Sequence, residues 1–140
     1  MKRLGASAKT KNLIDQNLIK SFYEQHKDEE LKDYQWMKND LDSNYSTSGI
    51  FAVDDLENPT RYFAIDMQQC RKKNTEYKCI VAIVEIDPET KQTTTPDIRL
   101  EYGSIRNISK NCNLVSNGVQ LQLVKTNDID SLLENNFEKF

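Results

Sequence analysis

A chain of 140 residues with 37% hydrophobic and 29% charged residues has the size and composition of one globular domain, so we expect a single domain over residues 1–140. The longest uninterrupted apolar run, Cys79 to Val84, is far shorter than the roughly 18 residues of a transmembrane span. The net charge of -3 has the wrong sign for a domain that neutralises phosphates, so nucleic acid is not expected as a partner.

The first forty residues allow two interpretations. Apolar residues between positions 13 and 23 recur at helical spacing, which favours an amphipathic helix over 11–25, and 28–38 is compatible with a second helix. Asparagine, aspartate and serine side chains in the first segment compete for backbone hydrogen bonds, however, and Tyr34 to Met37 fits a strand that runs into a turn equally well. This region therefore stays open between helix and strands.

Two strongly patterned segments predict the centre of a sheet. Residues Thr60 to Met67 alternate with a period of two, and Tyr77 to Ile86 is almost wholly apolar and rich in valine and isoleucine. Both are expected to be strands, with the second one central. The polar stretch 71–76 between them is suited to a hairpin loop, so the strands should pair antiparallel.

Apolar positions suggest the register of this hairpin. If Cys70 faces Cys79, then Ile65 faces Val84 and the apolar positions gather on one face, whereas a slip of one residue scatters them. This register places both cysteines on the same face near the loop, where opposed residues have Cβ atoms about 4.5–5.5 Å apart. A disulfide between them is therefore possible but not required.

Further strands and a helix are expected downstream. A turn at 87–90 ends the central strand, and 98–102 and 119–123 alternate between apolar and polar residues, whereas 104–113 suggests a loop or a short irregular strand. Apolar residues at spacings of three and four predict a C-terminal helix over 128–137. The expected fold class is α+β, with a single antiparallel sheet of five or six strands and the C-terminal helix packed on one face.

Three cysteines, Cys70, Cys79 and Cys112, are too widely spaced for a zinc knuckle or a redox pair. They are either small buried hydrophobes in a reducing compartment, or one disulfide and one spare thiol in an oxidising compartment. If the protein is exported, we expect Cys70 or Cys79 to be bonded, to the other or to Cys112. No metal ion or other cofactor is expected.

The start of the chain bears on its location. Met1-Lys2-Arg3 is similar to the basic region of a signal peptide, but Lys9, Thr10 and Lys11 follow where an apolar region would be needed. We expect either a cytosolic protein as written, or the mature form of an exported protein with an added methionine.

Several segments resemble, in this order, the surface-adhesin protein E-like family of Gram-negative envelope proteins. The similar segments cover about half of the chain: Arg3 to Ser7, Leu13 to Ile19, the tryptophan strand Tyr34 to Lys38, the strand Arg61 to Cys70, and its partner Cys79 to Ile86. The sequence departs from the family where three residues separate Asp66 from Cys70, and where Cys112 would have to replace a later cysteine. The resemblance implies an antiparallel sheet with a terminal helix, a lipoprotein or periplasmic protein of the envelope, in the periplasm or outer membrane, and binding of extracellular or envelope macromolecules.

The sequence offers few residues from which to assemble an active site. His26, the single histidine, lies in a hydrophilic run without a marked partner, and neither a glycine-rich phosphate loop nor a Gly-x-Ser-x-Gly elbow occurs. We therefore expect a non-enzymatic binding module.

A candidate binding face follows from the expected register. Opposite the predicted core lies a mixture of acidic, aromatic and aliphatic residues: Tyr62, Asp66, Val81, Ile83 and Glu85. Such a patch fits protein recognition better than catalysis, unless the N-terminal segment covers it. The leading expectation is an exported, adhesin-like envelope protein that binds another protein. The alternative is a cytosolic inhibitor or immunity protein that binds and neutralises a basic enzyme through its acidic surface.

Overall fold

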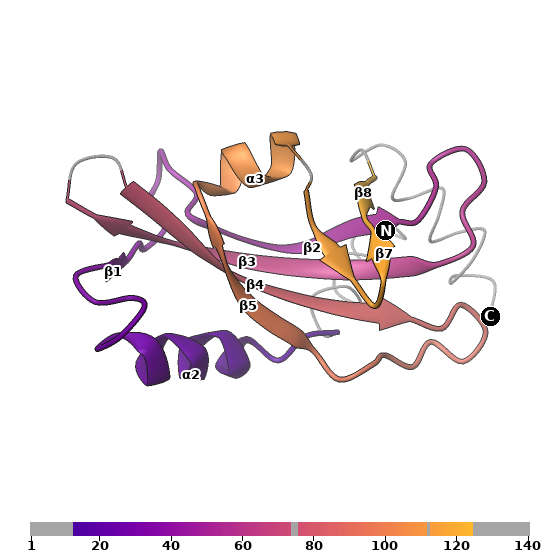
Figure 1. Cartoon of the computed structure of the whole chain (residues 1–140), viewed down its shortest axis with the longest axis horizontal. Helices are drawn as coiled ribbons and strands as arrows, with labels where there is room; N and C mark the ends of the chain where they lie inside the picture. Colours follow the sequence, from indigo (N-terminus) through magenta and orange to yellow (C-terminus); the bar gives the residue numbers. More distant parts are fainter. Residues whose placement is uncertain (1–12, 74–75, 112, 125–140) are drawn as a thin grey trace.

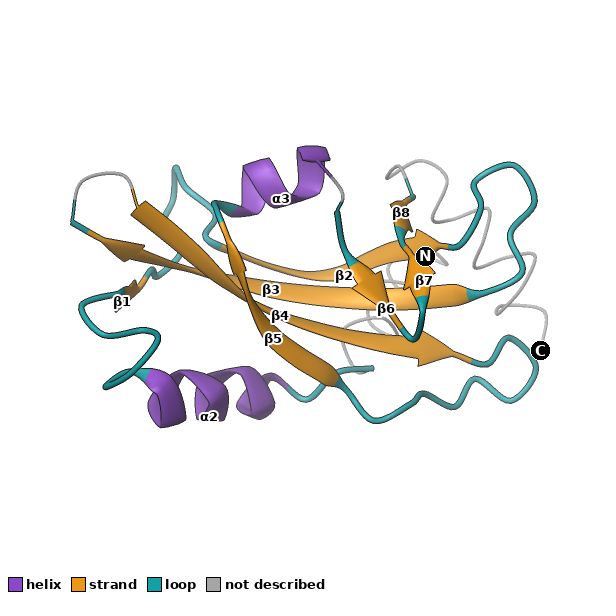
Figure 2. Cartoon of the chain, in the orientation of Figure 1, coloured by secondary structure: helices purple, strands orange, loops and turns teal. Residues whose placement is uncertain are grey.

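The computed structural model describes residues 13–73, 76–111 and 113–124, which form an α+β fold around a twisted antiparallel sheet (Figure 1). The strand order is β5-β4-β3-β2-β8, and β1 pairs with β3 beside this path. Helix α2 (Gln16–His26) and helix α3 (Ile105–Asn111) lie on opposite sides of the sheet, as Figure 2 shows. The strands are β1 (Gln35–Trp36), β2 (Ser46–Val53), β3 (Tyr62–Lys72), β4 (Glu76–Ile86), β5 (Asp97–Tyr102), β6 (Val115–Ser116), β7 (Val119–Gln120) and β8 (Gln122–Leu123).

The ambiguity of the N-terminal region resolves into one helix followed by one short strand. Asp15 caps α2 by accepting a hydrogen bond of 2.9 Å from the backbone N–H of Asn17. Ile19, on the inner face of the helix, is buried against the sheet. After α2 the chain turns, and Asp33 adopts a left-handed conformation with φ of 69° that aspartate tolerates well. The chain then enters β1, so this part of 28–38 forms a strand rather than a second helix.

The central hairpin of β3 and β4 is antiparallel, as predicted, but the expected register is wrong by one residue. Ile65 faces Ile83, and Cys70 faces Lys78. Cys70 and Cys79 consequently point to opposite faces of the sheet, because successive side chains of a strand alternate between faces. The expected register gathered apolar residues on one face, which gives no advantage when both faces are buried.

Two hydrophobic cores cover the two faces. The core under α2 contains, among others, Ile14, Ile19, Ala64, Cys70, Ile80, Ala82 and Val84. The core under α3 contains, among others, Phe63, Ile65, Met67, Cys79, Val81, Ile83, Ile108 and Leu121. A strand buried on both faces has a near-continuous apolar sequence, which explains why residues 79–84 do not alternate.

The segment after β5 differs from the expectation of a loop or an irregular strand. Ser104 caps helix α3 by accepting a hydrogen bond of 3.2 Å from the backbone N–H of Asn107, and Ile108 packs into the second core. A side-chain oxygen of Gln69 accepts a further hydrogen bond of 2.9 Å from the N–H of Ile105. These contacts with the sheet stabilise a helix of only seven residues.

The segment 119–123 is not one strand but two. Strand β7 pairs with β6 across the Asn117–Gly118 turn, whereas β8 pairs with β2 at the edge of the main sheet. Strand β2 was not predicted, because its sequence does not alternate between polar and apolar residues. Its pairing with β3 is also irregular, with a register shift between Thr47 and Ile50. The helix expected over 128–137 lies outside the described residues. Within the described part of the chain, no helix has the length and apolar character needed to cross a membrane.

Candidate functional site

The five residues of the predicted binding face do not share a face. Tyr62 and Asp66 lie on the α2 side of β3, whereas Val81, Ile83 and Glu85 lie on the α3 side of β4. Val81 and Ile83 are buried in the second core, and Asp66 is only 1% exposed. The expectation of one accessible face is therefore wrong, and the N-terminal segment, as α2, covers the side on which Asp66 lies.

Asp66 joins three elements beneath helix α2. Its carboxylate accepts a hydrogen bond of 2.9 Å from the backbone N–H of Gly49 in β2 and another from the side-chain amide of Gln16 in α2. Burial raises the pKa of this carboxyl, while the hydrogen bonds from Gly49 and Gln16 oppose the rise. Asp66 thus ties the helix to the sheet and is not presented to a ligand.

Glu85 is engaged at the other end of the sheet. Both of its oxygens accept hydrogen bonds from the Arg61 guanidinium, at 2.8 and 2.7 Å, and Asn117 Nδ2 donates to Oε1 at 2.9 Å. The hydrogen bond from Arg61 lowers the pKa of Glu85. These contacts hold the turn between β6 and β7 against the sheet.

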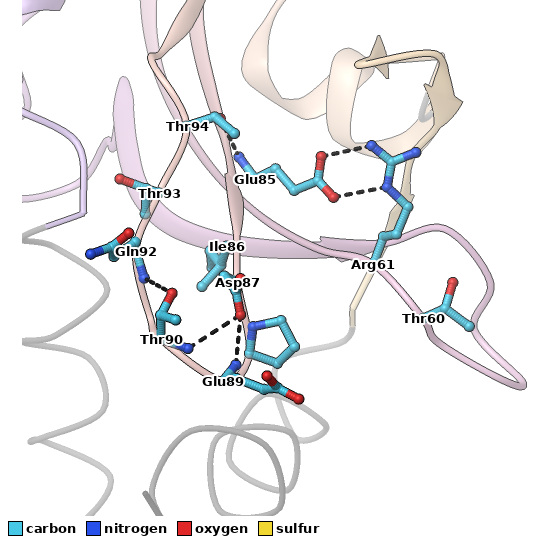
Figure 3. Close-up of a pocket in the computed structure, with 11 residues that line it drawn as sticks. Thr60, Arg61, Glu85, Ile86, Asp87, Glu89, Thr90, Gln92, Thr93 and Thr94 are labelled. Atoms are coloured by element: carbon cyan, nitrogen blue, oxygen red, sulfur yellow. Dashed lines mark hydrogen bonds and ion pairs between the residues drawn. The ribbon is translucent and has the colours of Figure 1, made fainter.

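Arg61 and Glu85 line a polar pocket of about 560 Å³, drawn in Figure 3 with the residues of the turn that follows β4. There the Asp87 carboxylate accepts hydrogen bonds from the backbone N–H groups of Glu89 and Thr90, at 2.8 and 3.2 Å. Several polar groups of this pocket therefore already have hydrogen-bond partners within the protein, either in the turn or in the pair of Arg61 and Glu85.

The cysteines and the histidine do not form a reactive group. Cys70 and Cys79 are buried free thiols, and no disulfide joins them because they lie on opposite faces; Cys112 lies outside the described residues. Burial raises the pKa of each thiol to about 12, so both stay protonated at neutral pH. His26 donates from Nδ1 to the Phe22 carbonyl at 2.8 Å and stacks on the Phe22 ring. Among the residues that the structure describes, no group of three or more His, Cys, Asp or Glu side chains could hold a metal ion.

A second concave surface, which we call the cationic cleft, is lined by residues at the end of α2, in the segment that leads into β1, in β1 and at the end of β3. Figure 1 shows where these elements lie. The volume of the cleft is about 820 Å³. Four cationic residues and two acidic residues line it, so it has a local charge of +2 on a chain of net charge -3. The lining residues are Tyr23, Lys27, Asp28, Asp33, Tyr34, Gln35, Arg71, Lys72 and Lys73.

Pairing of β1 with β3 builds the cleft from residues that are distant in sequence. Gln35 lies opposite Arg71 in this short antiparallel ladder. The Tyr23 hydroxyl of α2 donates to the Tyr34 carbonyl at 3.0 Å, which fixes the helix beside the strand. Tyr34 is 9% exposed and lines the cleft.

Aromatic rings and lysines continue from the cleft toward β5. Lys78 Nζ lies 4.8 Å from the centroid of the Tyr34 ring and 5.1 Å from that of Tyr102, so both rings are within cation–π range of one ammonium group. Lys78 also donates to the Glu30 carbonyl at 2.7 Å. Tyr102 is 81% exposed, which presents a large aromatic side chain beside the cleft.

From the sequence alone, residues 71–73 are expected only to form part of a polar hairpin loop. The available signal was the combination of this basic run with aromatic residues at 34, 36 and 102, but the three segments are far apart in the chain. Their proximity depends on the pairing of β1 with β3 and of β4 with β5. Comparisons of the chain with protein families, curated proteins and solved structures found no match.

Proposed function

We propose that this protein is a non-catalytic module that binds another protein, and that the cationic cleft is its binding surface. The observation that carries the proposal is the gathering of four cationic residues and two tyrosines in one concavity of a net acidic chain. Arginine and tyrosine are enriched among the residues that dominate binding energy at protein interfaces. Local positive charge steers and orients an acidic partner surface.

The placement of the chemically versatile residues supports binding over catalysis. Cys70 and Cys79 are buried and protonated, and the Nδ1 of His26 is bound to a backbone carbonyl of its own helix. None of these three residues lines the cationic cleft. A nucleophile or a general base has to lie within hydrogen-bond distance of the substrate, and the described lining of the cleft contains no cysteine, histidine or serine for these roles, only four cations, two tyrosines, one glutamine and two aspartates.

An envelope location forms part of the proposal, with the adhesin-like resemblance of the tryptophan and hairpin strands as its support. The native gene product, carrying an epitope tag at its C-terminus, should be recovered from the periplasm or the outer membrane on fractionation of its source cells. Recovery from the cytosol alone would contradict this location and favour a cytosolic partner.

Site-specific photo-crosslinking tests the binding surface. A benzophenone side chain is introduced at Tyr102, which is exposed beside the cleft, or at Val115 of β6, which is 45% exposed and follows Leu114 of the core under α3. We expect a protein adduct from position 102 only, identified by mass spectrometry and confirmed by titration of the purified partner. Charge reversal of Lys72 and Lys73 should abolish the adduct. Equal yields of adduct at both positions, or an adduct at position 102 that persists after charge reversal, would refute the assignment of the cleft as the binding surface.

A further inference from the structure

The cationic residues of the cleft differ in whether they already form ion pairs within the protein. Lys27 forms an ion pair of 2.7 Å with Glu24 on α2. In the part of the chain that the structure describes, no carboxylate forms an ion pair with Arg71, Lys72 or Lys73. No ion pair with a described carboxylate therefore neutralises the positive charge at the end of β3. Lys72 Nζ lies 5.9 Å from the centroid of the Tyr34 ring, and Lys72 is opposite Glu76 in the ladder of β3 and β4.

The carboxylates of Asp28 and Asp33 narrow the class of that ligand. Both line the same cleft as the cations, so a uniform polyanion would meet repulsion there and from the net charge of -3. A ligand with spaced carboxylates, separated by neutral or donor groups, can contact the cations and avoid the two acids. An acidic peptide has this pattern, whereas nucleic acid and sulfated glycan carry a dense, regular charge.

Strand β1 supplies a docking edge for such a peptide. It pairs with β3 along one edge, and within the described residues no strand pairs with its other edge. Gln35 of β1 lines the cleft, so this edge borders the cations. Because alternate residues of a strand direct their backbone groups to opposite edges, this two-residue strand offers the N–H and C=O of one residue to an added segment. An extended segment that adds to a strand edge gains main-chain hydrogen bonds and places alternate side chains on one face.

We infer that the cationic cleft binds an extended, acidic segment of the partner protein, added to the free edge of β1 with its carboxylates beside Lys72, on the α2 side of β3, and Lys73, in the turn that follows. This inference rests on the proposed function of the cleft. A volume of about 820 Å³ lies within the range of about 300–1,000 Å³ that holds a small ligand, which suits a short segment rather than a folded domain.

Fluorescence anisotropy tests the inference with defined probes and the full chain. A short labelled peptide that alternates glutamate with valine should bind, and its glutamine counterpart should not. Binding should weaken as salt is added, because exposed charges are screened. A variant with Lys72→Glu and Lys73→Glu should bind the acidic peptide about tenfold more weakly or worse, since two attractions become repulsions. Lys72→Gln with Lys73→Gln should give an intermediate loss.

The matched control reverses two charges on the opposite side of the sheet. Arg106→Glu with Lys110→Glu on α3 changes the net charge equally and should leave peptide binding unchanged. Circular dichroism shows that each variant is folded. Peptides that are N-methylated on one or the other set of alternate residues test strand addition, and only one set should abolish binding.

The outcomes separate this inference from the proposed function. A protein adduct at position 102 without affinity for any acidic peptide would refute the extended segment and leave the binding module intact. Tighter binding of a heparin fragment or oligothymidine, competing at the same cleft, would refute both. Failure of every probe together with the absence of an adduct would also refute both.

Discussion

Substitution of Asp66 should separate the cost of a buried charge from the value of a buried hydrogen-bond acceptor. The side chain is 1% exposed and accepts hydrogen bonds from Gly49 N, at 2.9 Å, and from the Gln16 amide. Asp66→Ala removes both the charge and the acceptor. Asp66→Asn removes the charge and keeps an oxygen in nearly the same place.

The environment of each donor sets the magnitude. Gly49 is half-buried, so after Asp66→Ala its N–H loses an acceptor at a cost of about 1–3 kcal/mol. Gln16 is exposed and its amide reaches water, which adds little. We therefore expect Asp66→Ala to lower the free energy of unfolding by about 1–3 kcal/mol. Asp66→Asn should be at least as stable as the wild type at neutral pH, because the Gln16 amide can turn to accept from it.

The pH dependence has a defined sign. Burial raises the pKa of Asp66 in the folded state above its ordinary value of 3.8, so the folded protein binds the proton more tightly than the unfolded chain. The stability of the wild type, measured relative to Asp66→Asn, is therefore fully present below 3.8 and falls as the pH rises through the raised pKa. Urea unfolding of the three proteins between about pH 3 and 8 measures this difference. A wild type that gains stability relative to Asp66→Asn as the pH rises, or an Asn variant as unstable as the Ala variant, would refute the reasoning.

Three further predictions concern other parts of the fold. Burial alone would raise the pKa of Asp54, but hydrogen bonds from the Thr60 hydroxyl and from backbone N–H groups lower it to about 2; an NMR titration should find this midpoint, and Thr60→Val should move it upward. The stabilisation that accompanies this low pKa is present above 3.8 and should be lost as the pH falls toward 2. Cys70 and Cys79 should react with a thiol reagent only at the rate of unfolding, and fast labelling in native buffer would contradict their burial. Ile65→Ala should cost about 2–5 kcal/mol in urea unfolding, because Ile65 is 0% exposed; a loss below about 1 kcal/mol would show that the second core is loosely packed.

Local sequence pattern determined the class of this fold and its central hairpin. The alternation before residue 67 and the valine- and isoleucine-rich segment 77–86 predicted two adjacent antiparallel strands, which are β3 and β4. Asp15 and Ser104 are both residue types that commonly cap the start of a helix, and such residues can be recognised in a sequence. Only Asp15, however, precedes a segment with a strong apolar periodicity. Helix α3 depends instead on contacts with the second core, and these are made only when the sheet has formed.

Tertiary structure decided the register of the hairpin and the composition of the binding site. A period-two pattern fixes register only when one face is buried and the other is exposed, and here helices α2 and α3 lie over opposite faces. The same limit applies to the cationic cleft. Lys27, Gln35 and Lys72 come together because β1 pairs with β3 and α2 packs beside them, and that pairing is a long-range contact which no local periodicity encodes.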